Sequence, residues 1–121
     1  MLYSLIHKGS GVGDQLFSYL AGRIRAADIG VDFSVVGREN WKADFIDVDF
    51  GKPNDFKYHT EFPSGKAVIE DPHSLYELKT SSFNPEFDFI PDGSVIDGCM
   101  AQDDKYFKRR LAEIDKWLKV S

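Results

Sequence analysis

Three closely spaced glycines lie near the start of the chain, in a pattern that could place a bound ligand against the backbone. Gly9, Gly11 and Gly13 follow an apolar segment at residues 2–6 and precede an amphipathic one. In α/β proteins such a turn aims a helix N-terminus, with its free N–H groups and positive dipole end, at a bound anion. The turn therefore predicts either an anion site or a plain connection from a strand to a helix.

Two common phosphate motifs do not fit this turn. The dinucleotide fingerprint Gly-x-Gly-x-x-Gly requires a third glycine, but position 14 is Asp14 when counted from Gly9 and position 16 is Leu16 when counted from Gly11. The chain also has no Gly-Lys-Ser/Thr run of the P-loop type. The turn is thus neither of these phosphate cradles.

Metal and nucleophile chemistry receive little support from residue spacing. The three histidines, His7, His59 and His73, stand far apart, and no His/Cys/Asp/Glu set has metal-ligand spacing. No Ser/His/Asp arrangement can be argued either. The one cysteine, Cys99, excludes an internal disulfide and is interpreted as a buried or half-buried free thiol rather than a nucleophile. We therefore predict no metal and no cofactor.

The glycine turn lies between elements that would position it. Residues 2–6 predict a buried parallel strand. Ser10 and Asp14 are competing N-cap candidates for the helix that follows, and Gly30 is its expected C-terminal stop. The apolar positions of that helix recur at helical spacing: Leu16, Leu20, Ile24 and Ala27, joined by Phe17. Residues 33–36 predict a second strand, which gives a right-handed parallel unit.

The rest of the chain is less regular. Six aromatic residues are scattered over residues 37–63: Trp41, Phe45, Phe50, Phe56, Tyr58 and Phe62. Their rings either seal a loop-rich flank of the core or stack on a sugar or base. A short strand is expected within 44–50, and further strands at 66–70 and 94–97. Asp71-Pro72 would start a short helix with Leu75 and Leu78 turned inward. A closing helix is expected over 103–119, with an apolar stripe of Tyr106, Phe107, Leu111, Ile114 and Leu118.

Together these elements predict one α/β domain over residues 1–121. We expect a Rossmann-like, mostly parallel sheet of four to five strands with helices on both faces. The net charge of −5 argues against general nucleic-acid binding. No apolar run is long enough for a signal-peptide core or a membrane span, so we expect a cytoplasmic protein.

Two blocks carry a resemblance to a known family. Residues 10–19, Ser-Gly-Val-Gly-Asp-Gln-Leu-Phe-Ser-Tyr, continue to Ala-Gly-Arg at 21–23. This run resembles the Gly-Gly-Leu-Gly-Asn-Gln-Met/Leu-Phe-Gln-Tyr opening motif of family 11 glycosyltransferases, the α-1,2-fucosyltransferases. Residues 102–107, Gln-Asp-Asp-Lys-Tyr-Phe, are similar to the family's Gln-Ser-Glu-Lys-Tyr-Phe run, and the glycine expected before it sits one place early, at Gly98.

The resemblance covers roughly a third of the chain and matches only the N-terminal half of the family's GT-B-type architecture. It implies a metal-independent transferase with a GDP-fucose donor and a glycan acceptor, and it carries over Gly11, Gly13, Asp14 and Gln15 as binding positions. By proximity we add His7 and Ser10 as candidate site residues, with Lys8 beside them.

Three departures from the family pattern bear on activity. The His-x-Arg-Arg-Gly-Asp segment that grips the donor phosphates is not in this sequence, and the C-terminal half of the family architecture is missing. Lys108-Arg109-Arg110 is no substitute, because its spacing predicts a solvated helix face. The third departure is Asp14 in place of the family's Asn. A carboxylate about 4–5 Å from a diphosphate oxygen costs on the order of 3–4 kcal/mol at a dielectric near 20, whereas a sugar hydroxyl could donate to it.

Three interpretations stay open. The chain is a fucosyltransferase-like domain that catalyses transfer when a second half, a partner chain or a second copy completes the cleft. Alternatively, it is a non-catalytic module on the same fold that binds a nucleotide, a sugar or a protein. In the third interpretation it is a structural protein whose aromatic-rich middle buries a dimer contact.

Overall fold

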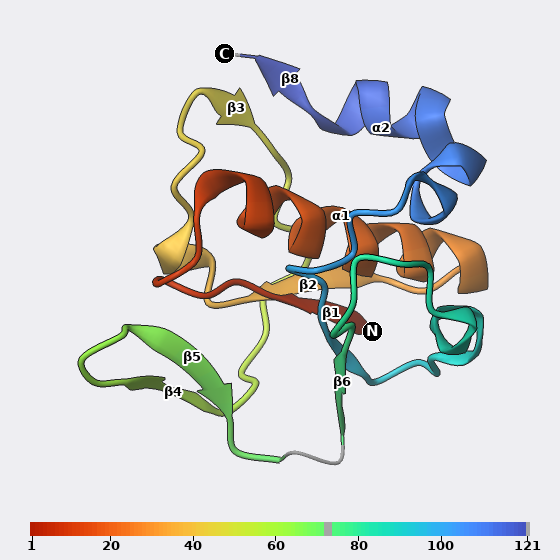
Figure 1. Cartoon of the computed structure of the whole chain (residues 1–121). Helices are drawn as coiled ribbons and strands as arrows, with labels where there is room; N and C mark the ends of the chain where they lie inside the picture. The colour runs from red at the N-terminus through yellow and green to blue at the C-terminus, as the bar shows by residue number, and fades with distance from the viewer. Residues whose placement is uncertain (72–73, 121) are drawn as a thin grey trace.

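The centre of the molecule is a parallel β-sheet, seen in a computed structural model that describes residues 1–71 and 74–120 (Figure 1). Its four strands run in the order β2-β1-β7-β6, and every neighbouring pair is parallel. The strands are β1 (Leu2–Leu5), β2 (Phe33–Val36), β6 (Leu75–Glu77) and β7 (Val95–Asp97). The predicted α/β class, strand number and parallel direction are therefore confirmed.

One face of the sheet is covered by helix α1 (Val12–Ile29). Gly11, rather than Ser10 or Asp14, is its N-cap residue, and its C-terminus is closed by Gly30 in the left-handed conformation at φ 70°. The helix lies very close to β1: a Cβ added to Gly22 would fall 1.8 Å from the Ser4 hydroxyl. Glycine at this position permits the close approach of helix and strand.

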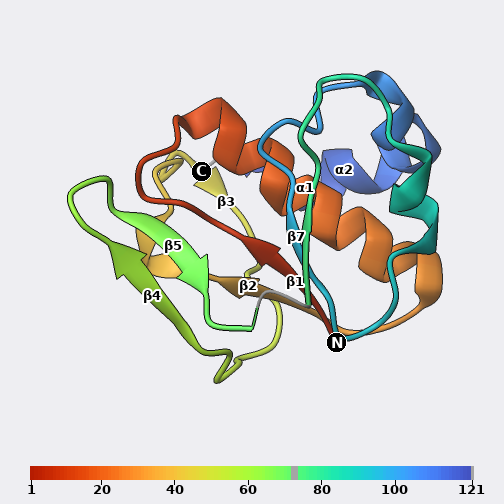
Figure 2. The ribbon, with the colours of Figure 1, turned by 60° about the horizontal axis from the view of Figure 1, so that its bottom comes forward.

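The other face of the sheet is covered by a β-hairpin, so the expectation of helices on both faces is wrong (Figure 2). The hairpin consists of β4 (Tyr58–Glu61) and β5 (Lys66–Ile69), which pair antiparallel. Alternation along β5 turns Ala67 and Ile69 inward. There they form a small apolar cluster with buried side chains of the central sheet: Leu5, Val36 and Val95.

Leu75 and Leu78 do not lie on the expected inward-facing helix. Leu75 belongs to strand β6, which extends the sheet beside β7, and Leu78 is buried just beyond it. Backbone pairing with β7 thus determines the conformation of this segment, whose apolar residues also fit helical spacing. Pro72 and His73 lie outside the described residues.

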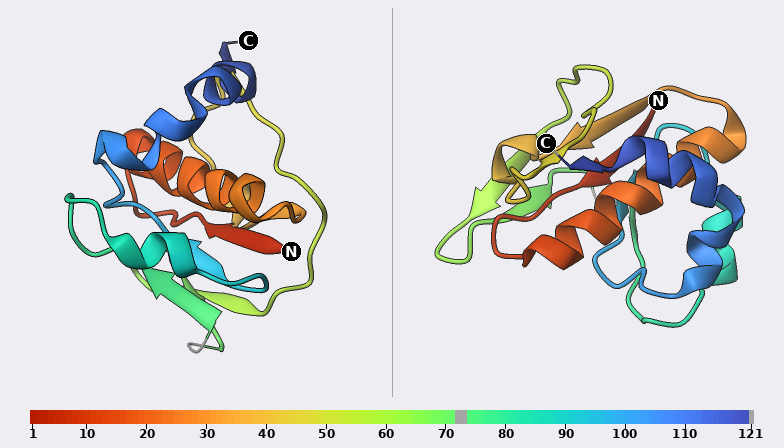
Figure 3. Two further views of the ribbon diagram at one scale, coloured as in Figure 1. Left: turned by 90° about the vertical axis from the view of Figure 1, so that its right-hand side faces the viewer. Right: turned by 90° about the horizontal axis from the view of Figure 1, so that it is seen from above.

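The expected helix over 103–119 is replaced by three short elements. Two 3₁₀ turns, η4 (Asp104–Tyr106) and η5 (Lys108–Arg110), precede α2 (Leu111–Trp117). The break lets Tyr106 pack in the core while Arg110 reaches Asp28 on α1, and it leaves Leu111 exposed instead of inward. Figure 3 shows this segment lying over the outer side of α1, on the side opposite the sheet. The last strand, β8 (Lys119–Val120), pairs with β3 (Ile46–Asp47).

Most aromatic rings of residues 37–63 seal the core, which was one of the two alternatives for them. Trp41 contacts both Tyr19 and Phe50 at ring distances of 5.6 and 5.8 Å. Phe62, in contrast, is 94% exposed at the tip of the hairpin. None of the helices in residues 1–71 and 74–120 has the length and apolar character needed to cross a membrane.

Candidate functional site

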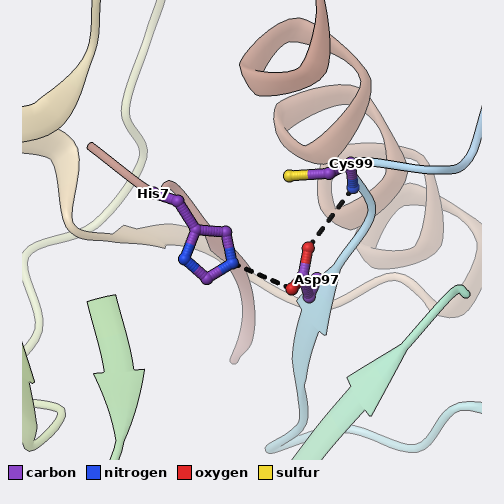
Figure 4. A group of neighbouring side chains, drawn as sticks. All are labelled: His7, Asp97 and Cys99. Carbon is purple, nitrogen blue, oxygen red and sulfur yellow. Dashed lines mark hydrogen bonds and ion pairs between the residues drawn. The ribbon is translucent and has the colours of Figure 1, made fainter. Parts of the chain in front are cut away.

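The parallel sheet brings the residues at the carboxyl ends of β1 and β7 together, although they are 90 positions apart in the sequence. His7 follows β1 by two residues and Asp97 ends β7. Nε2 of the His7 ring lies 2.8 Å from Oδ2 of Asp97 (Figure 4). In open parallel sheets, ligands bind outside the carboxyl ends of the strands. The pair therefore stands where such a fold binds ligands.

Asp97 is largely buried and is held in its ionised form. Burial is the strongest influence on this carboxyl group and raises its pKa, but hydrogen bonds from His7 and from the Cys99 amide outweigh it and leave the pKa below its ordinary value. Since an ionised carboxylate can only accept, Nε2 of His7 must carry the shared proton.

The opposite nitrogen of the His7 ring has no such partner. Only 5% of His7 is exposed, and its Nδ1 atom is buried without a hydrogen bond to any residue that the structure describes. Buried polar atoms are nearly always paired in folded proteins, so an orphaned ring nitrogen is uncommon. His7 is therefore more than an ordinary core histidine with both nitrogens satisfied.

Cys99 completes the group two residues beyond Asp97. Its Sγ atom lies 3.6 Å from the Ser10 hydroxyl, which comes from the glycine turn. Burial, reinforced by the charge of Asp97, raises the pKa of the thiol to about 12. At neutral pH the thiol is protonated, which agrees with the half-buried thiol expected from the sequence and argues against a thiolate nucleophile.

A pocket of about 330 Å³ opens over this group. Its wall opposite the strands comes from the β4–β5 hairpin, which contributes Ser64 and Lys66. The hairpin turn rests on the glycine turn: a Cβ added to Gly9 would fall 2.9 Å from the Ser64 carbonyl oxygen. The complete lining is His7, Gly9, Ser10, Ser64, Lys66, Asp97 and Cys99.

The other glycines of the turn have no role in packing. Gly11 and Gly13 are exposed, and a Cβ added to either would meet nothing within 4 Å. Neither has a positive φ. Asp14 is half-buried beside them, close enough to Cys99 for its charge to add to the rise in the thiol pKa. The surface at the start of α1 is therefore open to a ligand.

Gln15 is the one candidate that the structure places away from this open surface. It is fully buried, and its amide nitrogen donates to the carbonyl oxygens of His7 and Asn40 at 2.8 and 2.9 Å. Its amide oxygen accepts from the Lys42 backbone N–H at 2.9 Å. Gln15 thus fixes the loop after β2 to the glycine turn, which is a positioning role.

Two groups considered from the sequence lie outside the pocket. His59 is exposed on β4. Lys108 and Arg109 are exposed, as expected, and Arg109 and Arg110 also make ion pairs with Asp28, Asp88 and Glu113. Sequence reasoning missed Asp97 and Cys99 as members of the site. Their position could have indicated this, because they follow the strand predicted at 94–97. That strand was expected in the same parallel sheet as the strand at 2–6, which precedes His7.

Comparison with known proteins adds no relative. No protein-family model matches this chain, and neither a curated protein nor a solved structure matches it. The residues and the geometry of the pocket therefore carry the functional argument.

Proposed function

We propose that this chain is a glycosyltransferase-like domain of the α-1,2-fucosyltransferase type, whose pocket binds a nucleotide sugar such as GDP-fucose or the glycan acceptor. Transfer then requires a second half or a partner chain, because the sequence holds no counterpart of the family's arginine segment. The GT-B-type architecture is part of the same proposal.

The observation that carries this proposal is that the two resembling blocks lie side by side. Phe17 in the first block and Phe107 in the second have ring centroids 5.6 Å apart. The glycine turn that opens the first block is also joined to the segment before the second one through Ser10 and Cys99. Two short similarities separated by some eighty residues in the sequence are thus in contact in the fold, and Ser10 at the start of the first block lines the pocket.

The open glycines support the same conclusion. Glycine in a helix costs about 0.5–1 kcal/mol relative to alanine, and no contact or backbone strain in this fold requires Gly13. A ligand that approaches the backbone closely would explain its presence. The free N–H groups at the start of α1 and the exposed Lys66 would face phosphate oxygens. Asp14 would accept from a sugar hydroxyl.

The proposal is tested by titration calorimetry of the purified chain with GDP and with GDP-fucose in the presence of a chelator. We expect one site, and tighter binding of GDP-fucose than of GDP because Asp14 then has a hydroxyl donor. Lys66→Glu should weaken binding at least tenfold, whereas Lys57→Glu, an exposed lysine just before the same hairpin, should not change it. Absence of heat at millimolar ligand would contradict donor binding by this chain.

A non-catalytic binding module is the second candidate, and Asp14 favours it. Its carboxylate lies in the first turn of α1, where its negative charge would repel a diphosphate. The two candidates differ in turnover. A chain that binds the nucleotide sugar but never releases GDP, even after a C-terminal half from a family enzyme is supplied, would be a binding module.

A further inference from the structure

We propose that His7, Asp97 and Cys99 form a binding site for a divalent zinc ion. Each side chain offers one ligand atom, and these three atoms all lie within 4.8 Å of one another. Figure 4 shows His7 approaching from the segment after β1, while Asp97 and Cys99 approach from the end of β7. Two segments distant in the sequence thus converge on a single point.

The donor set is one that zinc accepts. Zinc ions in proteins are bound by imidazole nitrogen, thiolate sulfur and carboxylate oxygen, and sites with three protein ligands keep a fourth position for water or a substrate. Calcium and magnesium prefer oxygen ligands alone, so a nitrogen, oxygen and sulfur set selects against them. The chemistry of the three side chains therefore commits the site to zinc rather than to a hard cation.

The geometry requires only small movements. A tetrahedral zinc ion at ordinary bond lengths holds its ligand atoms about 3.3–3.6 Å apart. The His7 and Asp97 atoms, now 2.8 Å apart, would separate slightly as the ion replaces the shared proton. The thiol sulfur would move inward, and its neighbour at 3.6 Å is the Ser10 hydroxyl, which can rotate away. No strand has to shift.

Charge and protons balance on binding. The thiol of Cys99 loses its proton to solvent and binds as a thiolate. The proton on Nε2 of His7 is released to solvent and Nδ1 takes one up, so the ring stays neutral and offers the lone pair of Nε2 to the ion. One thiolate and the Asp97 carboxylate then neutralise the two charges of the ion. The pocket of about 330 Å³ over these residues leaves room for a water at the fourth position.

Burial supports this site over an incidental cluster. His7 is 5% exposed, and the side chain of Asp97 is 16% exposed. Surface acidic groups often gather without an ion, but a buried histidine and a largely buried carboxylate beside a half-buried thiol do so rarely.

This inference is independent of the proposed nucleotide-sugar function. The resemblance implies a metal-independent transferase, so zinc binding would set this chain apart from that family. The metal titration uses no nucleotide, and the nucleotide calorimetry uses a chelator. Failure of one proposal therefore leaves the other intact.

The experiment titrates Co²⁺, as a spectroscopic substitute for Zn²⁺, into the chelator-treated, untagged full chain. We expect one equivalent to bind with a sulfur-to-cobalt charge-transfer band and visible bands of tetrahedral intensity, and one equivalent of Zn²⁺ to abolish them. Mutation of a residue that only hydrogen-bonds to a metal ligand lowers metal affinity about 10- to 100-fold. Cys99→Ala removes a ligand itself, so it should lower the Co²⁺ affinity about 100-fold or more and abolish the charge-transfer band. His59→Ala, an exposed histidine, is the matched control and should bind as the unaltered chain does.

Several results would overturn the proposal. One is the absence of a charge-transfer band in the unaltered chain, and another is unchanged affinity in Cys99→Ala. If Cys99→Ala does not fold, X-ray absorption of the zinc-loaded unaltered chain decides the question. One sulfur among the neighbours of the ion is expected, and a shell of only nitrogen and oxygen would rule the site out.

Discussion

The backbone amide of Gly98 donates a hydrogen bond to the hydroxyl of Ser18 over 3.0 Å. The same hydroxyl donates to the carbonyl oxygen of Leu5 over 2.7 Å. A single side chain on α1 thereby ties together the ends of β1 and β7, the two strands from which the pocket extends. The spacing between His7 and Asp97 depends on this bridge.

Replacing Gly98 by alanine should disturb that bridge. The added Cβ would lie 2.7 Å from Cβ of Ala21 and 3.1 Å from Cα of Ser18. Relief of such overpacking requires the strand and helix to separate, so we expect Gly98→Ala to lower the free energy of unfolding by about 1–3 kcal/mol. Urea denaturation followed by circular dichroism measures this, and unchanged stability would mean that the helix and strand can move apart freely.

Gly13→Ala should have the opposite effect on stability. Its Cβ would meet nothing within 4 Å, and alanine is favoured over glycine in a helix by about 0.5–1 kcal/mol. The added methyl group would nevertheless keep a ligand away from the backbone. We therefore expect a higher midpoint of urea denaturation together with weaker nucleotide-sugar binding in calorimetry. A stabilised variant with unaltered binding would remove Gly13 from the site.

Asp14→Asn should tighten the binding of GDP. Because Asp14 is half-buried, its effective dielectric lies between that of water and that of a protein surface. Its repulsion of a unit negative charge about 4 Å away is then about 1 to about 4 kcal/mol. Asp14 is not the N-cap residue, and loss of its charge from the first turn of α1 should cost only about 0.3–1 kcal/mol, so the fold should be retained. We expect at least a fivefold lower dissociation constant by calorimetry at low salt, with the gain shrinking as salt is added. Weaker binding would show that phosphates do not approach Asp14.

Asp97 should make the protein sensitive to acid. Burial raises its pKa, but hydrogen bonds from His7 and Cys99 lower it further, so the folded chain holds this proton less tightly than the unfolded chain. The ionised carboxylate therefore adds stability above the unfolded pKa of about 3.9, and this stability is lost as the pH falls through the lower folded value.

The test of this prediction is urea denaturation of the unaltered chain and of Asp97→Asn between about pH 6 and pH 2. The variant should lose less stability over the acid range, whereas Asp55→Asn, at an exposed position, should follow the unaltered chain. Equal acid dependence of Asp97→Asn and the unaltered chain would contradict an ionised, hydrogen-bonded Asp97.

The Cys99 thiol of the metal-free chain should react slowly with iodoacetamide at neutral pH. Its pKa of about 12, raised by burial and by Asp97, leaves almost no thiolate at pH 7. The rate should rise about tenfold for each unit of pH in the alkaline range below that pKa while the protein stays folded. Alkylation followed by mass spectrometry measures the rate. Rapid modification at pH 7 would mean that the thiol has an ordinary or lowered pKa.

Local sequence patterns predicted the first half of the sheet well. The apolar segments at residues 2–6 and 33–36 form β1 and β2, and Gly30 ends α1 as expected. These features depend on neighbouring residues alone. The conformation of Leu75–Glu77 could not be predicted in this way, because pairing with a strand twenty residues later determines it.

The candidate site was predictable only in part for the same reason. His7 and Ser10 lie beside the glycine turn and were found through it. Their partners Asp97 and Cys99 follow the last strand of the sheet, and only the strand order β2-β1-β7-β6 brings them opposite His7. The buried polar role of Gln15 likewise depends on Asn40 and Lys42, in a loop with no regular pattern.

The hairpin of β4 and β5 has a consequence for how this pocket can diversify. It supplies the wall that faces His7 but contributes no strand to the central sheet. Changes at Ser64 in the turn at residues 62–65 would therefore alter this wall, while the sheet keeps His7 and Asp97 at its edge in place. The shape of the pocket can thus vary independently of the strands that position His7 and Asp97.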